Sequence, residues 1–269
     1  DGQLNKPASG WTAFNDALAK GLNKGRNGLG VLYVFSGGNG AWEGDYSSAD
    51  SATSSRGVIA VCAVDAAGER SPYSERGSNL TVCAPSGRST TPATAPEITT
   101  TAVKDKYTED FGGTSAAAPM VSGVAALMLQ ANPRLTWRDV PLILARTARQ
   151  VDASKGGWSE LRSPLAGVTG HDVLRYSHHY GFGVVDAEAA TRLARSWQSV
   201  GGSAEQRKCG PFLMNVSKPI PEASTVTQQQ ADSTPASMDD GSAEEQYFEA
   251  LTELANNLDY NKAPTGGLS

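Results

Sequence analysis

One serine stands at the start of a long apolar segment, FGGTSAAAPMVSGVAALMLQANP at 111–133, directly after two glycines and a threonine. A helix that begins here directs its free backbone N–H groups toward developing negative charge, and the small residues around Ser115 let a substrate backbone come close. A serine hydroxyl is a weak nucleophile that needs a neighbouring base. The pattern indicates nucleophilic catalysis by Ser115; a serine that caps a buried helix is the alternative.

Short segments with helical or extended patterns must position this serine. Large apolar residues recur at three- and four-residue spacing over 11–22, which predicts an amphipathic helix. Apolar runs rich in β-branched residues predict strands at 31–35, 58–64 and 80–84. Continuous apolar strands between helices predict an α/β fold in which a mostly parallel sheet is covered on both faces.

More helices are predicted toward the C-terminus. The helix that begins at Ser115 is expected to end about three residues before Pro133, which cannot continue it. The segment TWRD predicts another helix start, with Thr136 as the cap and Asp139 reaching back to it. YGFGVVDAEAATRLARSW at 180–197 predicts a tight glycine turn, a short strand and a helix.

The composition narrows the functional classes. The 269 residues are 39% hydrophobic and 19% charged, and a net charge of −5 argues against a nucleic-acid partner. No apolar run reaches the ~18–20 residues of a membrane span, so no transmembrane helix is predicted, and the first residues show no signal peptide. Cys62, Cys83 and Cys209 form an odd set without a CxxC pair, so neither a zinc site nor a dense disulfide framework is expected.

The chain divides by composition into three parts. Residues 1–200 carry the strand and helix patterns, and 201–243 are expected to form a linker of disordered composition, poor in large apolar side chains. An isolated amphipathic helix is predicted at 244–258, with glutamates at its N-terminal end, where the helix dipole favours them. A docking helix without a chemical function is one interpretation of it, and its role is left open.

The segment GGTSAAAP at 112–119 resembles the nucleophile segment of subtilisin-like serine proteases. TWRDV at 136–140, YGFGVVDA at 180–187 and YVFSGGNG at 33–40 are similar to the kexin/furin branch of that family. The resemblance covers roughly residues 1–200. It implies a three-layer subtilisin-like fold, and a serine endopeptidase whose nucleophile is the serine of GGTS.

Under this resemblance Asn39, in SGGNG, corresponds to the asparagine of the family's oxyanion hole. Its side-chain N–H₂ group would donate to the tetrahedral intermediate beside the backbone N–H of Ser115. A turn in which asparagine tolerates a left-handed conformation is the alternative. The position of Asn39 after a predicted strand and upstream of Ser115 favours the oxyanion role.

Three of the carboxylates that follow this asparagine stand at informative spacing: Asp45, Asp50 and Glu75. The resemblance implies that Asp45 and Glu75 hold a calcium ion beneath the substrate pocket, together with a third aspartate; Asp1 is that aspartate or the residue after it. Clustered carboxylates repel one another unless a hard cation neutralises them. Asp50 matches an aspartate that faces the substrate residue before the cleaved bond (P1), where it selects Arg or Lys. A solvated acidic loop is the alternative.

The sequence departs from the kexin/furin pattern at three positions near these carboxylates. Ser47 and Gly77 stand where the family has a disulfide, so calcium and packing alone are expected to hold the loop. Ala52 replaces a family tyrosine, so no preference for the substrate residue at P4 is inferred.

Residues that could activate Ser115 are missing. Subtilisin-like triads follow the order Asp, His, Ser, whereas His171, His178 and His179 all follow Ser115. The last two histidines are interpreted as part of a polar loop. The chain is therefore interpreted as the C-terminal part of a catalytic domain without the half that carries the catalytic Asp and His, and it is expected to be inactive alone. No P domain, which usually follows in this branch, is recognised.

These observations predict a calcium-dependent serine endopeptidase that cleaves peptides or proteins after Arg or Lys and is incomplete in this chain. The resemblance implies a secreted, periplasmic or secretory-pathway location. The alternative is a non-catalytic or truncated homologue that binds basic peptides or a partner chain. An α/β-hydrolase esterase is disfavoured because GTSAA at 113–117 lacks the G-x-S-x-G elbow.

Overall fold

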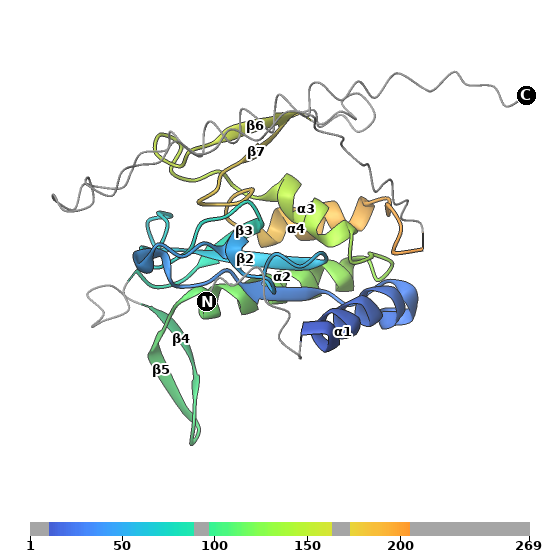
Figure 1. Ribbon diagram of the computed structural model, residues 1–269, viewed down its shortest axis with the longest axis horizontal. Coiled ribbons are helices and arrows are strands. Elements are labelled where there is room, and N and C mark those ends of the chain that lie inside the picture. Colours follow the sequence, from blue (N-terminus) through green and yellow to red (C-terminus); the bar gives the residue numbers. More distant parts are fainter. Residues whose placement is uncertain (1–10, 89–96, 163–172, 205–269) are drawn as a thin grey trace, which may run out of the picture. The chain divides into compact units, whose positions relative to one another are not determined.

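The computed structural model describes residues 11–88, 97–162 and 173–204 (Figure 1). The chain forms two compact units, 1–209 and 210–269, and every described residue belongs to the first. Several sequence predictions fall outside the described residues: the linker from residue 205 onward, the helix at 244–258, Asp1 and His171.

The described part of the chain contains four α-helices, three short 3-10 helices and seven strands. The α-helices are α1 (Trp11–Lys24), α2 (Thr114–Ala131), α3 (Asp139–Thr147) and α4 (Ala187–Ser196). The strands are β1 (Tyr33–Ser36), β2 (Val58–Val64), β3 (Leu80–Pro85), β4 (Ile98–Ala102), β5 (Lys106–Phe111), β6 (Ser159–Arg162) and β7 (Val173–Tyr176). The 3-10 helices are η1 (Gly25–Gly28), η2 (Ala41–Glu43) and η3 (Ser47–Ala49).

A parallel sheet with the strand order β1-β2-β3 forms the centre of the fold, as predicted. β2 and β3 coincide with their predicted segments to within one residue. β1 begins two residues later than predicted because the Val31 N–H donates to the Gly21 carbonyl (3.1 Å) and not to a ladder partner.

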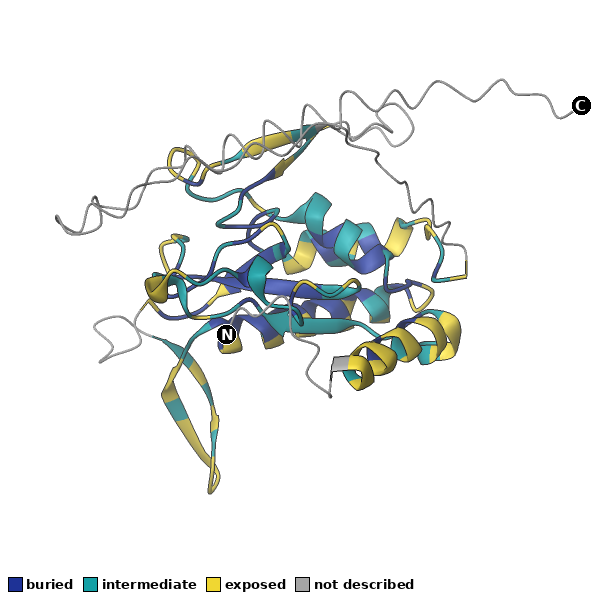
Figure 2. Ribbon diagram, in the orientation of Figure 1, coloured by how far each residue is buried: buried dark blue, intermediate teal, exposed yellow. Residues whose placement is uncertain are grey.

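The residues of β2 are buried almost throughout (Figure 2), and their side chains alternate between the two faces of the sheet, which explains the unbroken apolar sequence. On one face Val61 and Ala63 pack with the apolar sides of α2, α3 and α4. On the other face Cys62 packs with Tyr180 and Val184, which follow β7. Burial of this kind contributes about 1.5–3 kcal/mol for each large aliphatic side chain.

The same alternation on β1 places α1 and α2 on opposite faces of the sheet. Val34 packs against the cluster that contains α2. The neighbouring Phe35 ring instead lies 6.3 Å from the ring of Phe14 on α1. Helix, sheet and helix therefore form three layers, as the resemblance implied.

α2 is the central helix of the core. It packs against all three parallel strands and against α4. Its 18 residues have a mean hydropathy of 1.3, so by length and composition it qualifies as a candidate membrane span, which the sequence analysis had excluded. Eight of its residues are buried, and six of them, including Val121 and Met128, belong to the hydrophobic core. This packing explains its apolar sequence without a membrane.

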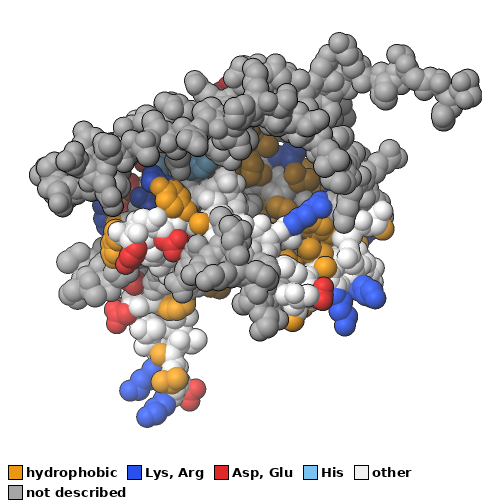
Figure 3. Space-filling view, in the orientation of Figure 1, with side chains coloured by type: hydrophobic (Ala, Val, Ile, Leu, Met, Phe, Trp, Pro, Cys, Tyr) orange, Lys and Arg blue, Asp and Glu red, His pale blue; other side chains and the backbone are white. Residues whose placement is uncertain are grey.

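Two antiparallel hairpins were not predicted. The β4–β5 hairpin extends away from the body (Figure 1) and carries charged and apolar side chains at its end (Figure 3). Its turn places Lys104 and Asp105 at φ of 61° and 54° without a glycine, so the usual hairpin signal is absent. β6 and β7 form the second hairpin.

A disulfide joins Cys62 on β2 to Cys83 on β3. The two cysteines are directly paired in the parallel register and both are fully buried. The sequence analysis did not anticipate this bond, because a 21-residue separation does not reveal which residues of two strands lie side by side.

The predicted interaction at the start of α3 is only partly correct. Asp139 reaches back as expected, and its Oδ2 accepts from the Thr136 N–H (2.7 Å). The Thr136 hydroxyl, however, donates to the same oxygen (2.8 Å) and caps no backbone N–H.

Asp139 is fully buried and joins α3 to the segment after α4. Its carboxylate accepts from Trp197 Nε1 (2.9 Å), Ser199 Oγ (2.6 Å) and the Val200 N–H (2.8 Å). Burial alone would raise the pKa of Asp139. The hydrogen bonds from Ser199, Thr136, Val200 and Trp197 outweigh burial and hold the pKa below its ordinary value of 3.8.

We expect Asp139→Asn to lower the free energy of unfolding by about 3 kcal/mol at pH 7, because an amide N–H₂ group replaces an acceptor that faces donors. A depressed carboxyl pKa stabilises the fold above about pH 4, and this contribution is lost as the pH falls through the lower folded-state pKa. Urea unfolding of wild type at pH 7 and pH 3 should therefore differ more than that of the variant. Asp16→Asn, an exposed substitution on α1, is the control, and an equally small effect of both substitutions would contradict this role.

Candidate active site

Ser115 lies in the first turn of α2 and is exposed, whereas its neighbours Thr114 and Ala116 are buried. Gly113 precedes the helix at φ 75°, a conformation that a residue with a side chain rarely adopts. A β-carbon at Gly113 would also lie 3.2 Å from Asn39 Nδ2. The glycine thus lets the chain turn sharply into the helix and leaves the serine hydroxyl accessible.

Asn39 follows the C-terminal end of β1 and meets this helix start directly. Its Oδ1 accepts hydrogen bonds from the Thr114 backbone N–H (2.8 Å) and from Thr114 Oγ1 (2.9 Å). A backbone N–H can only donate, so the amide atom that faces Thr114 must be the oxygen. The planar side chain therefore directs its N–H₂ group away from Thr114.

Thr114 is a positioning residue that the sequence analysis did not single out. It is fully buried, and its hydroxyl accepts from the Gly38 N–H (3.3 Å) while it donates to Asn39. The threonine thus connects the turn after β1 to the start of α2. Its place directly before Ser115 in the chain was the available signal.

Asp45 and Glu75 both approach Gly40. The Gly40 N–H donates to Glu75 Oε1 (2.8 Å). A β-carbon at Gly40 would lie 2.9 Å from Asp45 Cβ and 3.1 Å from Glu75 Oε1, and one at Gly38 would lie 2.2 Å from the same oxygen. Glycine on each side of Asn39 is therefore required to make room for the buried glutamate.

Glu75 is 6% exposed, and burial is the largest cause that raises its pKa above the ordinary value of 4.5. The hydrogen bond from Gly40 acts in the opposite direction, and the charges of Asp45 and Asp50 raise the pKa further. A carboxylate in this environment favours a proton or a nearby cation.

The donor set was tested against the calcium ion that the resemblance implies. Among the described residues there is no group of three or more Asp, Glu, His or Cys side chains that could hold a metal ion. Asp45 and Glu75 supply hard oxygen ligands of the kind calcium prefers. They fit calcium as two of its ligands, and backbone carbonyls, water or the carboxylate of Asp1, which lies outside the described residues, would supply the others.

Asp50 follows η3 and has a structural function in its own loop. Its Oδ1 accepts from the backbone N–H groups of Ala52 (2.9 Å) and Thr53 (2.8 Å). This arrangement agrees with the loop alternative for one carboxylate oxygen, and Oδ2 takes no part in these two bonds. Asp50 lies close enough to Glu75 to influence its pKa, so the three predicted carboxylates do share one region.

Hydrogen bonds hold the loop where the family has a disulfide, so the expectation of calcium and packing alone was wrong. The Ser47 N–H donates to the Arg76 carbonyl (3.0 Å). Asn79 Nδ2 donates to both the carbonyl and the hydroxyl oxygen of the fully buried Ser47 (3.1 Å each). A β-carbon at Gly77 would lie 2.7 Å from the Ser48 nitrogen, so the glycine permits this close approach.

His178 and His179 lie in the turn that follows β7. The His178 carbonyl accepts a hydrogen bond from the Gly77 N–H (2.9 Å). The His178 ring packs edge-on against the ring of Tyr176, with 5.9 Å between the ring centres. These contacts agree with a role in a polar loop.

The chain matches the model of the Subtilase family over residues 3–183 and belongs to that family. Among solved structures, a serine protease of Aeromonas sobria superimposes with a TM-score of 0.59 at 23% identity, over 72% of this chain and 41% of that chain. The predicted subtilisin-like fold is confirmed.

Curated relatives then place the chain near the kexin/furin branch, as predicted. It is 38% identical to Protease KEX1 of Kluyveromyces lactis, 39% identical to proprotein convertase subtilisin/kexin type 6 of Homo sapiens and 34% identical to furin of Bos taurus. These alignments cover 70%, 68% and 76% of this chain. The chain spans only 23%, 18% and 24% of the length of those relatives.

Proposed function

We propose that the protein to which this chain belongs is a serine endopeptidase in which Ser115 is the nucleophile and Asn39 a donor to the oxyanion. The observation that carries the proposal is the pair of hydrogen bonds from Thr114 to Asn39 Oδ1 (2.8 and 2.9 Å). Because the Asn39 amide oxygen accepts these two hydrogen bonds, its N–H₂ group is directed away from Thr114. Asn39 Nδ2 lies near Gly113, which directly precedes α2. Membership of the Subtilase family supports the same assignment.

In this mechanism Ser115 Oγ attacks the carbonyl carbon of the substrate while a base takes the hydroxyl proton. The oxyanion that forms accepts hydrogen bonds from Asn39 Nδ2 and from the backbone N–H of Ser115. The carbon–nitrogen bond then breaks as the protonated base gives its proton to the leaving amine. Water hydrolyses the acyl-enzyme by the same sequence of proton transfers.

The base and its partner carboxylate belong, in this proposal, to a segment outside this chain. All three histidines of the chain follow Ser115. Within the described residues β1 is an edge strand, and a groove of about 490 Å³ lies beside it, lined by Leu32, Val34, Ala126 and Leu129 among others. The edge strand can pair with a further strand, and the apolar groove can be covered by the side chains of that added segment.

Asn39→Ala in the full-length protein tests the assignment. We expect turnover to fall by ~10²–10³, the range known for loss of an oxyanion donor in subtilisin itself, with little change in ground-state binding. Steady-state kinetics on a peptide substrate would measure kcat and KM separately, with Ser78→Ala, an exposed loop substitution, as the control and Ser115→Ala as the inactive reference. An unchanged kcat with a raised KM would remove Asn39 from the oxyanion role, and activity in Ser115→Ala would remove the nucleophile.

We further propose that Asp45 and Glu75, with a third carboxylate, hold a calcium ion that supports the substrate pocket. The ion would neutralise the buried Glu75 carboxylate, whose pKa is raised by burial and by the neighbouring acids.

We also propose that the protein is located in the secretory pathway or outside the cell. The buried Cys62–Cys83 disulfide supports an oxidising compartment.

Calcium removal should lower the thermal midpoint of wild type, since a ligand that binds only the folded state stabilises it by about 2.7 kcal/mol at one hundred times Kd. Glu75→Gln keeps an oxygen for the Gly40 N–H and removes the buried charge. The thermal midpoint of the variant should therefore not change when EGTA is added. In the presence of EGTA it should equal or exceed the thermal midpoint of wild type. Calorimetry with and without EGTA measures both effects, and Glu43→Gln, which changes an exposed carboxylate two residues before Asp45, is the control. A wild-type midpoint that does not respond to EGTA would exclude the site.

We also propose that Asp50 selects Arg or Lys at P1. A substrate cation that enters a narrow pocket loses water, and a fixed anion offsets that loss. Asp50 Oδ1 is already engaged by Ala52 and Thr53, so the second oxygen would face the substrate.

Asp50→Asn is a clean test because asparagine retains Oδ1 for both backbone donors. We expect the ratio of kcat/KM for an Arg substrate to that for a matched Leu substrate to fall by roughly two orders of magnitude or more, with little change for Leu. Glu43→Gln again serves as the control for a nearby loss of negative charge. An unchanged Arg:Leu ratio would make Asp50 a loop carboxylate only, whatever the role of Ser115.

A further inference from the structure

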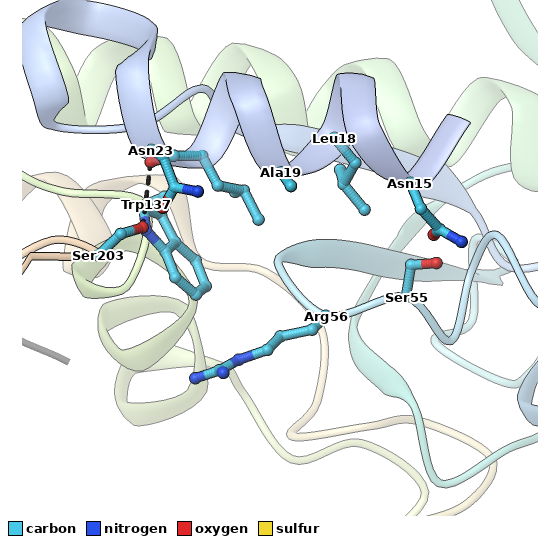
Figure 4. Close-up of a pocket in the computed structure, with 9 residues that line it drawn as sticks. Asn15, Leu18, Ala19, Asn23, Ser55, Arg56, Trp137 and Ser203 are labelled. Atoms are coloured by element: carbon cyan, nitrogen blue, oxygen red, sulfur yellow. Dashed lines mark hydrogen bonds between the residues drawn. The ribbon is translucent and has the colours of Figure 1, made fainter. Parts of the chain in front are cut away.

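A pocket of about 320 Å³ lies between α1, the loop before β2 and the loop before α3 (Figure 4). Leu18, Leu22 and Trp137 form an apolar floor, and each is buried. Arg56 and Asn15 lie at the rim.

The pocket is at the opposite end of the sheet from Ser115. Arg56 comes two residues before Val58, where β2 begins. Asn39, by contrast, follows the C-terminal end of β1 and contacts the start of α2. A ligand in this pocket would thus bind away from the candidate active site.

Arg56 is an exposed cation whose charge is not neutralised within the described part of the chain. Its guanidinium carbon lies 5.8 Å from the centre of the Trp137 ring, and Figure 4 shows the side chain extended toward that indole. Across residues 11–88, 97–162 and 173–204, none of the ion pairs involves Arg56. The described residues that line the pocket include no carboxylate.

The indole of Trp137 is fixed before any ligand arrives. Its Nε1–H donates to Ser203 Oγ (3.0 Å), and that hydroxyl donates to the Leu22 carbonyl (3.2 Å). Because its only polar group is occupied, the indole offers a ligand an apolar ring and no donor. The apolar floor is therefore preorganised, which reduces the entropic cost of binding.

We propose that this pocket binds a carboxylate attached to one aromatic or large aliphatic group. Arg56 would take the carboxylate through two parallel hydrogen bonds, and the apolar group would pack on Trp137 and Leu18. The volume lies at the lower end of the ~300–1,000 Å³ typical of ligand sites, so it suits a group of amino-acid size. A free aromatic acid and the C-terminal residue of a peptide share this chemistry.

The features of the pocket exclude other common ligands. A nucleotide or polyphosphate needs several cations or a row of backbone N–H groups, whereas Arg56 is the one charged residue among those that line the described pocket. A basic peptide segment, the substrate class proposed for the active site, would be repelled by Arg56. The site is therefore independent of the proposed peptidase activity.

Binding of N-acetyl-L-phenylalaninate to the full 269-residue chain tests this site, with the uncharged amide of the same compound as the matched probe. We expect a Kd of roughly millimolar or tighter for the acid and binding of the amide at least ~10-fold weaker, because only the carboxylate pairs with Arg56. Isothermal titration measures the affinities. The indole N–H resonance of Trp137, assigned with Trp137→Phe, reports the location.

Three arginine variants make the test specific. Arg56→Gln should weaken binding of the acid about 10-fold, and Arg56→Lys, which keeps the charge but not the fork of donors, should fall between it and wild type. Arg134→Gln, an exposed arginine outside the pocket, should leave affinity unchanged.

A tripeptide, Ala-Ala-Phe, with a free or amidated C-terminus distinguishes the two sources. Binding of N-acetyl-L-phenylalaninate supports a small-molecule site. Binding only of the tripeptide with a free C-terminal carboxylate supports a site for a peptide terminus. Equal affinity for acid and amide, unchanged affinity in Arg56→Gln, or no shift of the Trp137 resonance would overturn the proposal.

Discussion

The two hydrogen bonds from Thr114 to the amide oxygen of Asn39 connect the end of β1 to the start of α2 across 75 residues of sequence. They fix the orientation of the amide against Thr114, the residue that precedes Ser115. This contact is possible only because α2 packs along all three parallel strands, so that its N-terminus reaches the turn after β1. The sheet and the central helix thus act as the rigid frame of the candidate site.

The turn after β1 meets two demands at once. Asn39 faces Thr114, while Gly38 and Gly40 on either side give up their side-chain space to Glu75. Asn39, the oxyanion donor in our proposal, and the buried Glu75 carboxylate are therefore linked through three consecutive residues. A change that moves Glu75 must also disturb Asn39, which gives a physical reason why a metal site near this turn would matter to catalysis.

The fold separates its chemistry between the two ends of the sheet. Turns at the C-terminal ends of parallel strands lie together at one end of the sheet, and these turns carry Asn39 and lead toward Glu75. At the opposite end Arg56 lies over Trp137, and α1 also lines the pocket there. Asp45, Asp50 and Glu75 lie near the first end, and Arg56 is the one charged residue among those that line the pocket at the second end, so the two proposed sites suit ligands of opposite charge.

The sequence by itself determined the parallel sheet, the helix start at Ser115 and the reach of Asp139 back to Thr136, because local pattern specifies each of them. Only the tertiary structure decided which distant residues touch. The pairing of Cys62 with Cys83 depends on strand register, and the bonds of Asn79 to Ser47 depend on how two loops pack. The β4–β5 hairpin escaped prediction because its turn contains no glycine. The Cys62–Cys83 pair and the bonds between Asn79 and Ser47 arise instead from long-range packing, which residue spacing along the chain does not encode.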